Sequence, residues 1–352
     1  MITRRNVSKP KSKSQKELDN ETIHSTLRMG FADYFKMGGG EAAIKAEADQ
    51  LNAAAIEEIQ KEIEICPRDA DDVSVCSGGS CDNGDMERGE AVFSKLQIEH
   101  DTPLLNTSKV PKVHFVVPTS KTDWAHDACL ESEDSVQYRI SKWCESHADK
   151  YSGLGSDQGQ TLTCSVTSQP IDIMDIDVMK HRKASVLVLP YFIWINDLRT
   201  DKVDETLDEL VPLLLNRSLS KDELIARYDN IEAARDKAYV FICSHTTRDK
   251  RCGVTAPYMK KVLDKLLQQH GLYRDNSDFR PDGCQAFFIS HVGGHKFAGN
   301  VQIYLRDSQT LVWLGRVTPK YIPTVFEHLI LPDEPKLSVP EKVRCVKKYA
   351  KW

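Results

Sequence analysis

The chain has 352 residues, of which 40% are hydrophobic and 28% are charged, and its formal net charge is −5. This length allows two ordinary domains, and the near balance of charge argues against broad electrostatic binding to nucleic acid or to an anionic membrane. No apolar run approaches the roughly 18–20 residues that cross a bilayer, so we expect a soluble chain with no membrane partner.

Residues 1–111 are expected to form a partly disordered N-terminal arm. Residues 40–65 are rich in Ala, Glu, Lys and Ile at helical spacing, which predicts one helix. Residues 66–89 form an acidic loop that contains three cysteines, which are Cys66, Cys76 and Cys81. These cysteines have two interpretations, a metal or redox group and free thiols, and the sequence does not decide between them.

The N-terminus also bears on the cellular location. It lacks the apolar segment of a secretory signal, and the ten cysteines then indicate a reducing compartment rather than a disulfide scaffold. Residues 1–16 are basic, which weakly resembles a mitochondrial presequence, but Pro10 would interrupt an amphipathic helix there. We therefore expect a cytoplasmic protein, with a mitochondrial location as the alternative.

Residues 112–234 are expected to form a first α/β domain. It is expected to be smaller than the second domain, or a degenerate form of an α/β domain. An apolar strand at 113–118 precedes a helix that runs through Cys144, and Ala184 to Trp194 is expected to form a second strand. The segment 204–234 has helical spacing, with a capping box that begins at Ser220.

Residues 235–331 predict a second α/β domain whose elements are clearer. The order is a strand, a helix, a strand, a pair of antiparallel strands and a closing helix, over residues 238–243, 254–271, 285–290, 301–305, 311–314 and 321–331. This order is typical of a thioredoxin-like sheet, whose first strand-to-helix turn is the reactive corner. The last residues, 332–352, are expected to form an extended tail over the surface.

Two cysteines lie at that corner, and two histidines follow the next strand. Eight residues separate Cys243 from Cys252, and His291 and His295 flank a pair of glycines. Thiolates and imidazoles bind zinc or an iron–sulfur cluster. A zinc finger needs a closer cysteine pair and a helix under its histidines, so the spacing favours a two-iron cluster. His245 is an alternative ligand. Cys284, just before the strand that leads to His291, could also be a ligand, but we expect a small core residue there, and Cys129, Cys144, Cys164 and Cys345 show no ligand spacing.

Three segments carry a resemblance to a known family. They are Cys243-Ser-His-x5-Arg-Cys252-Gly, His291-Val-Gly-Gly-His295-Lys-Phe-Ala-Gly-Asn300 and Trp313-Leu-Gly-Arg316-Val-Thr-Pro319. They resemble the sucrase/ferredoxin-like family over roughly residues 112–330. The resemblance implies a C-terminal thioredoxin-like ferredoxin domain that binds a [2Fe–2S] cluster. It also implies the cluster ligands, which are Cys243, Cys252, His291 and His295.

Such a ligand set implies electron transfer rather than a conventional enzymatic reaction. Two neutral imidazoles in place of two thiolates should raise the reduction potential, and the outer nitrogen of each imidazole should couple electron transfer to a proton. We therefore expect a proton-coupled one-electron carrier.

Two other classes of function stay open. One is a thiol oxidoreductase on a thioredoxin fold, although the Cys-x-x-Cys spacing is missing. The other is a zinc-stabilised binding protein. Sugar hydrolysis is discounted, because the sequence places no carboxylate pair in a glycosidase site.

The sequence points to two protein partners. One is a redox partner, which is expected to be acidic because four basic residues surround the ligands, namely Arg248, Lys250, Arg251 and Lys296. The resemblance also implies contact between the terminal Trp352 and the cytosolic iron–sulfur targeting machinery. Lys351 departs from that pattern, in which an acidic residue precedes the aromatic one.

Overall fold

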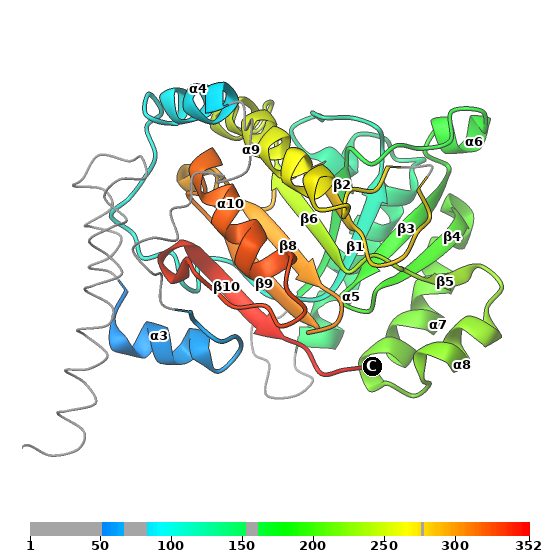
Figure 1. The fold of residues 1–352 in the computed structure, drawn as a ribbon. Coiled ribbons are helices and arrows are strands. Elements are labelled where there is room, and N and C mark those ends of the chain that lie inside the picture. The colour runs from blue at the N-terminus through cyan, green and yellow to red at the C-terminus, as the bar shows by residue number, and fades with distance from the viewer. Residues whose placement is uncertain (1–50, 67–82, 153–160, 276–277) are drawn as a thin grey trace, which may run out of the picture.

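A mixed β-sheet that runs through both predicted domains dominates the structure (Figure 1). The computed structural model describes residues 51–66, 83–152, 161–275 and 278–352. Within these ranges the sheet has ten strands in the order β10-β9-β8-β6-β7-β2-β1-β3-β4-β5. The strands are β1 (Pro111–Pro118), β2 (Thr161–Thr167), β3 (Lys183–Leu189), β4 (Ile193–Arg199), β5 (Ile231–Ala233), β6 (Ala238–Cys243), β7 (Cys284–Ile289), β8 (Val301–Leu305), β9 (Thr310–Leu314) and β10 (Val343–Lys348).

Helices pack against both halves of the sheet. The helices are α3 (Ala53–Gln60), α4 (Asn83–Phe93), α5 (Val136–Ser152), α6 (Ile176–Met179), α7 (Val203–Asn216), α8 (Lys221–Arg227), α9 (Lys250–Gln269) and α10 (Ile322–Val325). Helices α5 and α7 pack against each other in the N-terminal half, while α4, α9 and α10 pack together in the C-terminal half. In the described ranges, no helix combines the length and apolar character needed to cross a membrane.

The two halves of the sheet repeat one topology. In the first half β1 and β2 are parallel and joined through α5, β3 is antiparallel to β1, and β4 is antiparallel to β3. In the second half β6 and β7 are parallel and joined through α9, β8 is antiparallel to β6, and β9 is antiparallel to β8. The halves meet where β2 and β7 pair at Thr167 and Ile289. Both predicted α/β units are therefore built on the same plan.

The alternation of side chains along the strands divides the core into three clusters. In β6, Ala238, Val240 and Ile242 face α9 and α10, because successive side chains of a strand point to opposite faces. Tyr239, Phe241 and Cys243 face the other side. There they join residues of β1 and β3 in a cluster that both halves share. Cys243 thus lies at the border of the two halves.

The structure corrects two expectations in the first half. The apolar run Ala184 to Trp194 is not one strand, because it turns at Pro190-Tyr191 and forms the hairpin of β3 and β4. The helical segment 204–234 divides into α7 and α8 and then ends in the short strand β5. The capping box at Ser220 is confirmed, since Ser220 and Glu223 bond each other's backbone N–H groups.

The two ends of the chain pack on the folded body. Of the helix expected over residues 40–65, the structure shows α3 at Ala53–Gln60, while residues 40–50 lie outside the described residues. The C-terminal segment is extended, as expected, but most of residues 337–345 are buried. It forms β10 beside β9 and then reaches the N-terminal half, where the chain ends next to α7 and α8 (Figure 1). It is therefore part of the sheet and not a surface tail.

Candidate metal centre

The two cysteines of the candidate site are held at adjacent ends of β6 and α9. Cys243 is the last residue of β6, and its N–H donates to the carbonyl oxygen of Asn300 at 3.0 Å. Asp249 caps α9 by accepting the N–H of Arg251 at 2.8 Å, which places Cys252 in the first helical turn. Both cysteine side chains are buried, with exposed fractions of 1% and 0%.

The two thiols contact each other and differ in acidity. A hydrogen bond with the Cys252 thiol, supported by a second one from His291, holds the pKa of Cys243 well below its ordinary value in spite of burial. The same bond with Cys243, together with burial, raises the pKa of Cys252. The opposite directions of the two shifts favour ionisation of Cys243 before Cys252, and a thiolate is the form of cysteine that binds a metal.

The two histidines follow β7 on a loop that two glycines shape. Gly293 and Gly294 have φ angles of +83° and +66°, a region that favours glycine. A Cβ atom at Gly294 would lie 2.4 Å from Nη2 of Arg344, so this position also requires the absence of a side chain. The loop brings the rings of His291 and His295 to a centroid distance of 5.3 Å, with His295 exposed to solvent.

The four candidate ligands therefore lie next to one another in the fold. Cys252 contacts Cys243, His291 reaches Cys243, and the ring of His295 lies beside that of His291. Across the described part of the chain, no three His, Cys, Asp or Glu side chains converge on a point where they would hold a single metal ion. Thiolates and imidazoles are ligands of both zinc and two-iron clusters, so the donor chemistry of this set fits either group.

His245 is committed to the surrounding structure and not to the ligand set. Its Nδ1 accepts the backbone N–H of His291 at 3.1 Å. Its Nε2 then donates to the carbonyl oxygens of Trp124 and Ala125, at 3.1 and 2.9 Å. Both ring nitrogens are used, so His245 positions the loop of His291, and its interpretation as an alternative ligand is wrong.

Arg344 is a site residue that the sequence analysis missed. Its guanidinium is buried and donates to the carbonyl oxygen of Gly293 at 3.0 Å, to Oδ1 of Asn300 at 2.8 Å and to the carbonyl oxygen of Thr107 at 2.9 Å. Burial lowers its pKa to about 10, while the neighbouring thiols of Cys345, Cys243 and Cys252 favour its charge. The sequence predicts a surface tail at this position. Only the partly apolar pattern of residues 343–346 indicates a buried strand there.

Asn300 is a second site residue, after Arg344, to which the sequence assigned no role. Its side chain accepts from Arg344 and donates to the carbonyl oxygen of Gly294 at 3.2 Å. Its own carbonyl oxygen accepts the N–H of Cys243. Asn300 therefore links the cysteine strand to the histidine loop.

The expected ring of positive charge is largely balanced by acids. Arg248 pairs with Asp127 at 3.1 Å, Arg251 with Asp249 at 2.7 Å and Lys296 with Glu99 at 3.1 Å. Lys250 is exposed. Neighbouring carboxylates therefore offset the positive charge of three of these four residues.

Two described cysteines outside the ligand set, Cys66 and Cys284, contact other parts of the fold. Cys66 is half-buried, with its Sγ atom 3.8 Å from Nδ1 of His328. Cys76 and Cys81 lie outside the described residues. Cys284 is buried in the apolar cluster beneath α9, as a core residue should be.

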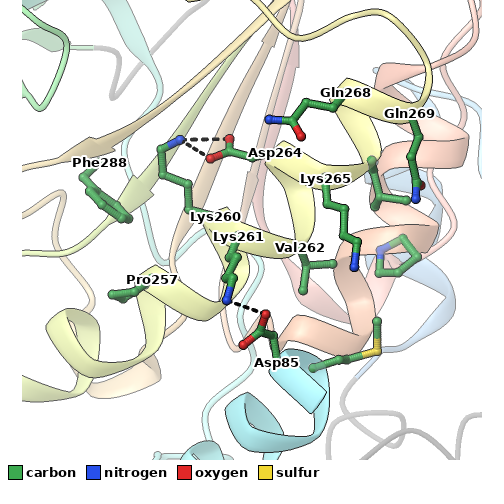
Figure 2. Close-up of a pocket in the computed structure, with 13 residues that line it drawn as sticks. Asp85, Pro257, Lys260, Lys261, Val262, Asp264, Lys265, Gln268, Gln269 and Phe288 are labelled. Atoms are coloured by element: carbon green, nitrogen blue, oxygen red, sulfur yellow. Dashed lines mark hydrogen bonds and ion pairs between the residues drawn. The ribbon is translucent and has the colours of Figure 1, made fainter. Parts of the chain in front are cut away.

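A cavity of about 590 Å³ opens between α4 and α9, apart from the four candidate ligands (Figure 2). Two ion pairs span or flank it. Lys261 meets Asp85 of α4 at 2.6 Å, and Lys260 meets Asp264 at 2.6 Å. The pair of Lys261 and Asp85 attaches α4 to α9, whereas the pair of Lys260 and Asp264 lies within α9.

With this geometry in place, comparison with known proteins decides the family. A family model described as sucrase/ferredoxin-like matches residues 104–345, a range that includes the four candidate ligands and Arg344. The chain belongs to the sucrase/ferredoxin-like family. No solved structure matches it.

Two kinds of fungal relative share this family. Actin patches distal protein 1 of Saccharomyces cerevisiae is 58% identical over 325 residues, which are 92% of this chain and 100% of that protein. Altered inheritance of mitochondria protein 32 of Clavispora lusitaniae is 37% identical over 95 residues, which are 27% of this chain and 31% of that protein. The first likeness therefore spans almost the whole chain, and the second only about a quarter of it.

Proposed function

We propose that this member of the sucrase/ferredoxin-like family is a one-electron carrier. Its [2Fe–2S] cluster would be held by Cys243, Cys252, His291 and His295. The observation that carries the proposal is the contact of two buried thiols with each other and with His291. A [2Fe–2S] cluster, when bound, supplies a one-electron redox couple.

We also propose that each half of the sheet is a thioredoxin-like unit. Support comes from the shared order of two parallel strands joined by a helix, two antiparallel strands and a closing helix. On this plan, Cys243 and Cys252 occupy the turn between the first strand and its helix. The second half would then be the ferredoxin domain and the first half its degenerate counterpart.

The protein residues around the site would set the potential and handle the proton. Two neutral imidazoles leave the cluster with two fewer negative charges than four thiolates would, which raises the potential toward the range of about −150 to +300 mV found in Rieske centres. Buried Arg344 adds positive charge near the thiols. His295 is exposed to solvent, so its ring would connect a bound cluster with water and supply the route for a coupled proton.

Burial of the thiols argues against the thiol oxidoreductase. The lowered pKa of Cys243 and its contact with Cys252 would suit disulfide exchange. A substrate disulfide must however approach a sulfur atom in line, and both sulfur-bearing side chains are at most 1% exposed. Electron transfer needs no such approach.

The partners and the location remain part of the proposal. A redox partner would dock near the exposed His295. A targeting factor that reads Trp352 would have to release it first, because Trp352 Nε1 donates to Leu219 and Arg217 holds the carbonyl oxygens of Ala350 and Lys351. The name of the yeast relative refers to actin patches, which supports a cytoplasmic location. The name of the other relatives refers to mitochondria, which is the alternative.

The test is the metal content and the redox potential of protein purified without oxygen. We expect about two irons and two acid-labile sulfides per chain, and a potential that falls by about 59 mV per pH unit when one proton accompanies the electron. Cys243→Ser should lose the cluster, whereas Cys284→Ser, a change in the apolar core, should retain it. A colourless protein with stoichiometric zinc and no iron would overturn the proposal.

A further inference from the structure

Three cysteines outside the candidate centre lie together in the N-terminal half. Cys129 lies in a short helical turn at Ala128–Leu130, Cys144 on α5 and Cys164 on β2. They come from three different elements and follow one another at intervals of 15 and 20 residues. Their spacing gave no sign of a site, and only the pairing of β1 with β2 under α5 brings them together.

The side chain of Cys129 lies against Cys164. The Sγ atom of Cys129 donates to the carbonyl oxygen of Cys164 at 3.5 Å, which brings the two thiols close together. The Sγ atom of Cys164 lies 3.7 Å from the carbonyl oxygen of Gln137. We propose that Cys129 and Cys164 are a redox-active dithiol that forms a reversible disulfide.

The surroundings assign a different role to each thiol. Cys129 and Cys164 are both half-buried, but Cys129 follows the exposed Asp127 and precedes Leu130, which is 37% exposed. Cys129 is therefore the thiol that an oxidant meets first. The hydrogen bond with Cys129, and then burial, raise the pKa of Cys164, which makes this thiol the poorer first nucleophile.

Glutathione disulfide is a suitable oxidant by chemical class, and the reaction balances with it. The Cys129 thiolate attacks one sulfur of glutathione disulfide, forms a mixed disulfide and releases one glutathione. Cys164 then loses its proton, and its sulfur attacks that of Cys129, which releases the second glutathione. The protein loses two electrons and two protons in total, and the oxidant becomes two thiols.

Cys144 is the natural control, because it belongs to the same cluster but lacks these contacts. Its side chain is 6% exposed and packs in the apolar core of the N-terminal half. Burial raises its pKa, with the neighbouring Cys129 adding to the effect. Cys144 should therefore stay reduced under conditions that oxidise the other two.

The dithiol also borders the loop that carries Cys243. Two hydrogen bonds join this loop to the segment that precedes Cys129. The hydroxyl of Ser244 donates to the carbonyl oxygen of Thr122 at 2.8 Å, and the hydroxyl of Thr247 donates to the carboxylate of Asp123 at 2.8 Å. The disulfide would form whether or not the Cys243 site holds a cluster.

Peptide mapping of the full chain tests this directly. The protein is equilibrated in buffers of reduced and oxidised glutathione, quenched with acid, alkylated and digested with trypsin. Cleavage after Lys and Arg places Cys129, Cys144 and Cys164 on separate peptides, which are residues 122–139, 143–150 and 151–180. We expect a disulfide between 122–139 and 151–180 that dithiothreitol reverses, with 143–150 alkylated throughout.

Two variants separate the steps. Cys164→Ser should stop the reaction at a mixed disulfide between Cys129 and glutathione. Cys144→Ser should change the glutathione ratio at half-oxidation by less than about twofold. Alkylation of both 122–139 and 151–180 in the most oxidising buffer would overturn the proposal. So would a disulfide that links either of them to 143–150.

Discussion

Arg344 donates a hydrogen bond of 3.0 Å to the carbonyl oxygen of Gly293, the residue midway between the two candidate histidines. The arginine belongs to β10, close to the C-terminus, while the glycine belongs to the loop after β7. A residue of β10 therefore holds the histidine loop in place through this hydrogen bond.

We predict that Arg344→Lys lowers the free energy of unfolding by about 2–4 kcal/mol. Lysine keeps the charge but cannot satisfy Gly293, Asn300 and Thr107 with the planar geometry of a guanidinium. Urea unfolding measures the loss. The control is Arg306→Lys, at a partly exposed arginine paired with Asp282 and Asp307, where we expect less than about 1 kcal/mol. Equal losses in the two variants would contradict the structural role of Arg344.

The two glycines of the histidine loop should respond differently to alanine. Both have positive φ, so either substitution strains the backbone by about 1 kcal/mol. At Gly293 a Cβ atom meets no other atom within 4 Å, whereas at Gly294 it would approach the guanidinium of Arg344. We therefore expect Gly294→Ala to destabilise the protein more than Gly293→Ala in urea unfolding. The reverse order would show that the loop differs from the one described.

His245 and His291 can be separated by spectroscopy of the iron-loaded protein. His245→Gln should weaken the loop, because it disturbs the contacts to His291, Trp124 and Ala125, but it should leave the shape of the EPR spectrum of the reduced protein unchanged. His291→Cys should alter that spectrum and lower the potential, because a thiolate replaces a neutral ligand. A larger spectral change in His245→Gln than in His291→Cys would exchange their roles.

His114 should make the stability of the protein depend on pH. It is buried between Tyr304 and Ser165, and burial lowers its pKa from 6.5 to about 3. In the unfolded chain His114 binds a proton below about pH 6.5, whereas in the folded chain it stays neutral down to about pH 3. The free energy of unfolding therefore decreases as the pH falls through this window. Between pH 7 and pH 5 this residue alone should cost about 2 kcal/mol.

Urea unfolding at the two pH values measures that contribution. In His114→Gln the difference between pH 7 and pH 5 should shrink by about 2 kcal/mol. Tyr304→Phe removes the hydroxyl that His114 contacts but keeps the titrating ring, so it should lower stability at both pH values and retain the difference. An unchanged difference in His114→Gln would mean that another group carries the pH dependence.

The sequence predicted the elements of the second half well because its periodicity is simple. The strand 238–243 and the strand 301–305 coincide with β6 and β8. Helix α9 begins four residues before the expected range of 254–271, so its first turn includes Cys252. The first half was harder to predict, because Thr161–Thr167 is a polar strand and the run through Pro190 hides a hairpin. Propensity cannot reveal a turn inside a continuous apolar run.

The candidate site shows the same limit. Local motifs placed the two cysteines and two histidines, since each pair lies within one short segment. Arg344 lies 44 residues after Asn300 and far from either motif, and it reaches them only because β10 pairs with β9. The contact between Cys129 and Cys164 likewise depends on strand pairing. Long-range contacts of this kind follow from topology, which short motifs do not encode.

Pulsed EPR of the reduced protein detects the nitrogen nuclei coupled to the iron spins, and so shows whether two histidines of this chain bind the cluster. We expect coupling to two histidine nitrogens, reduced to one in both His291→Cys and His295→Cys and unchanged in His245→Gln. A reduced protein with no histidine nitrogen coupling, or one whose coupling disappears only in His245→Gln, would contradict it.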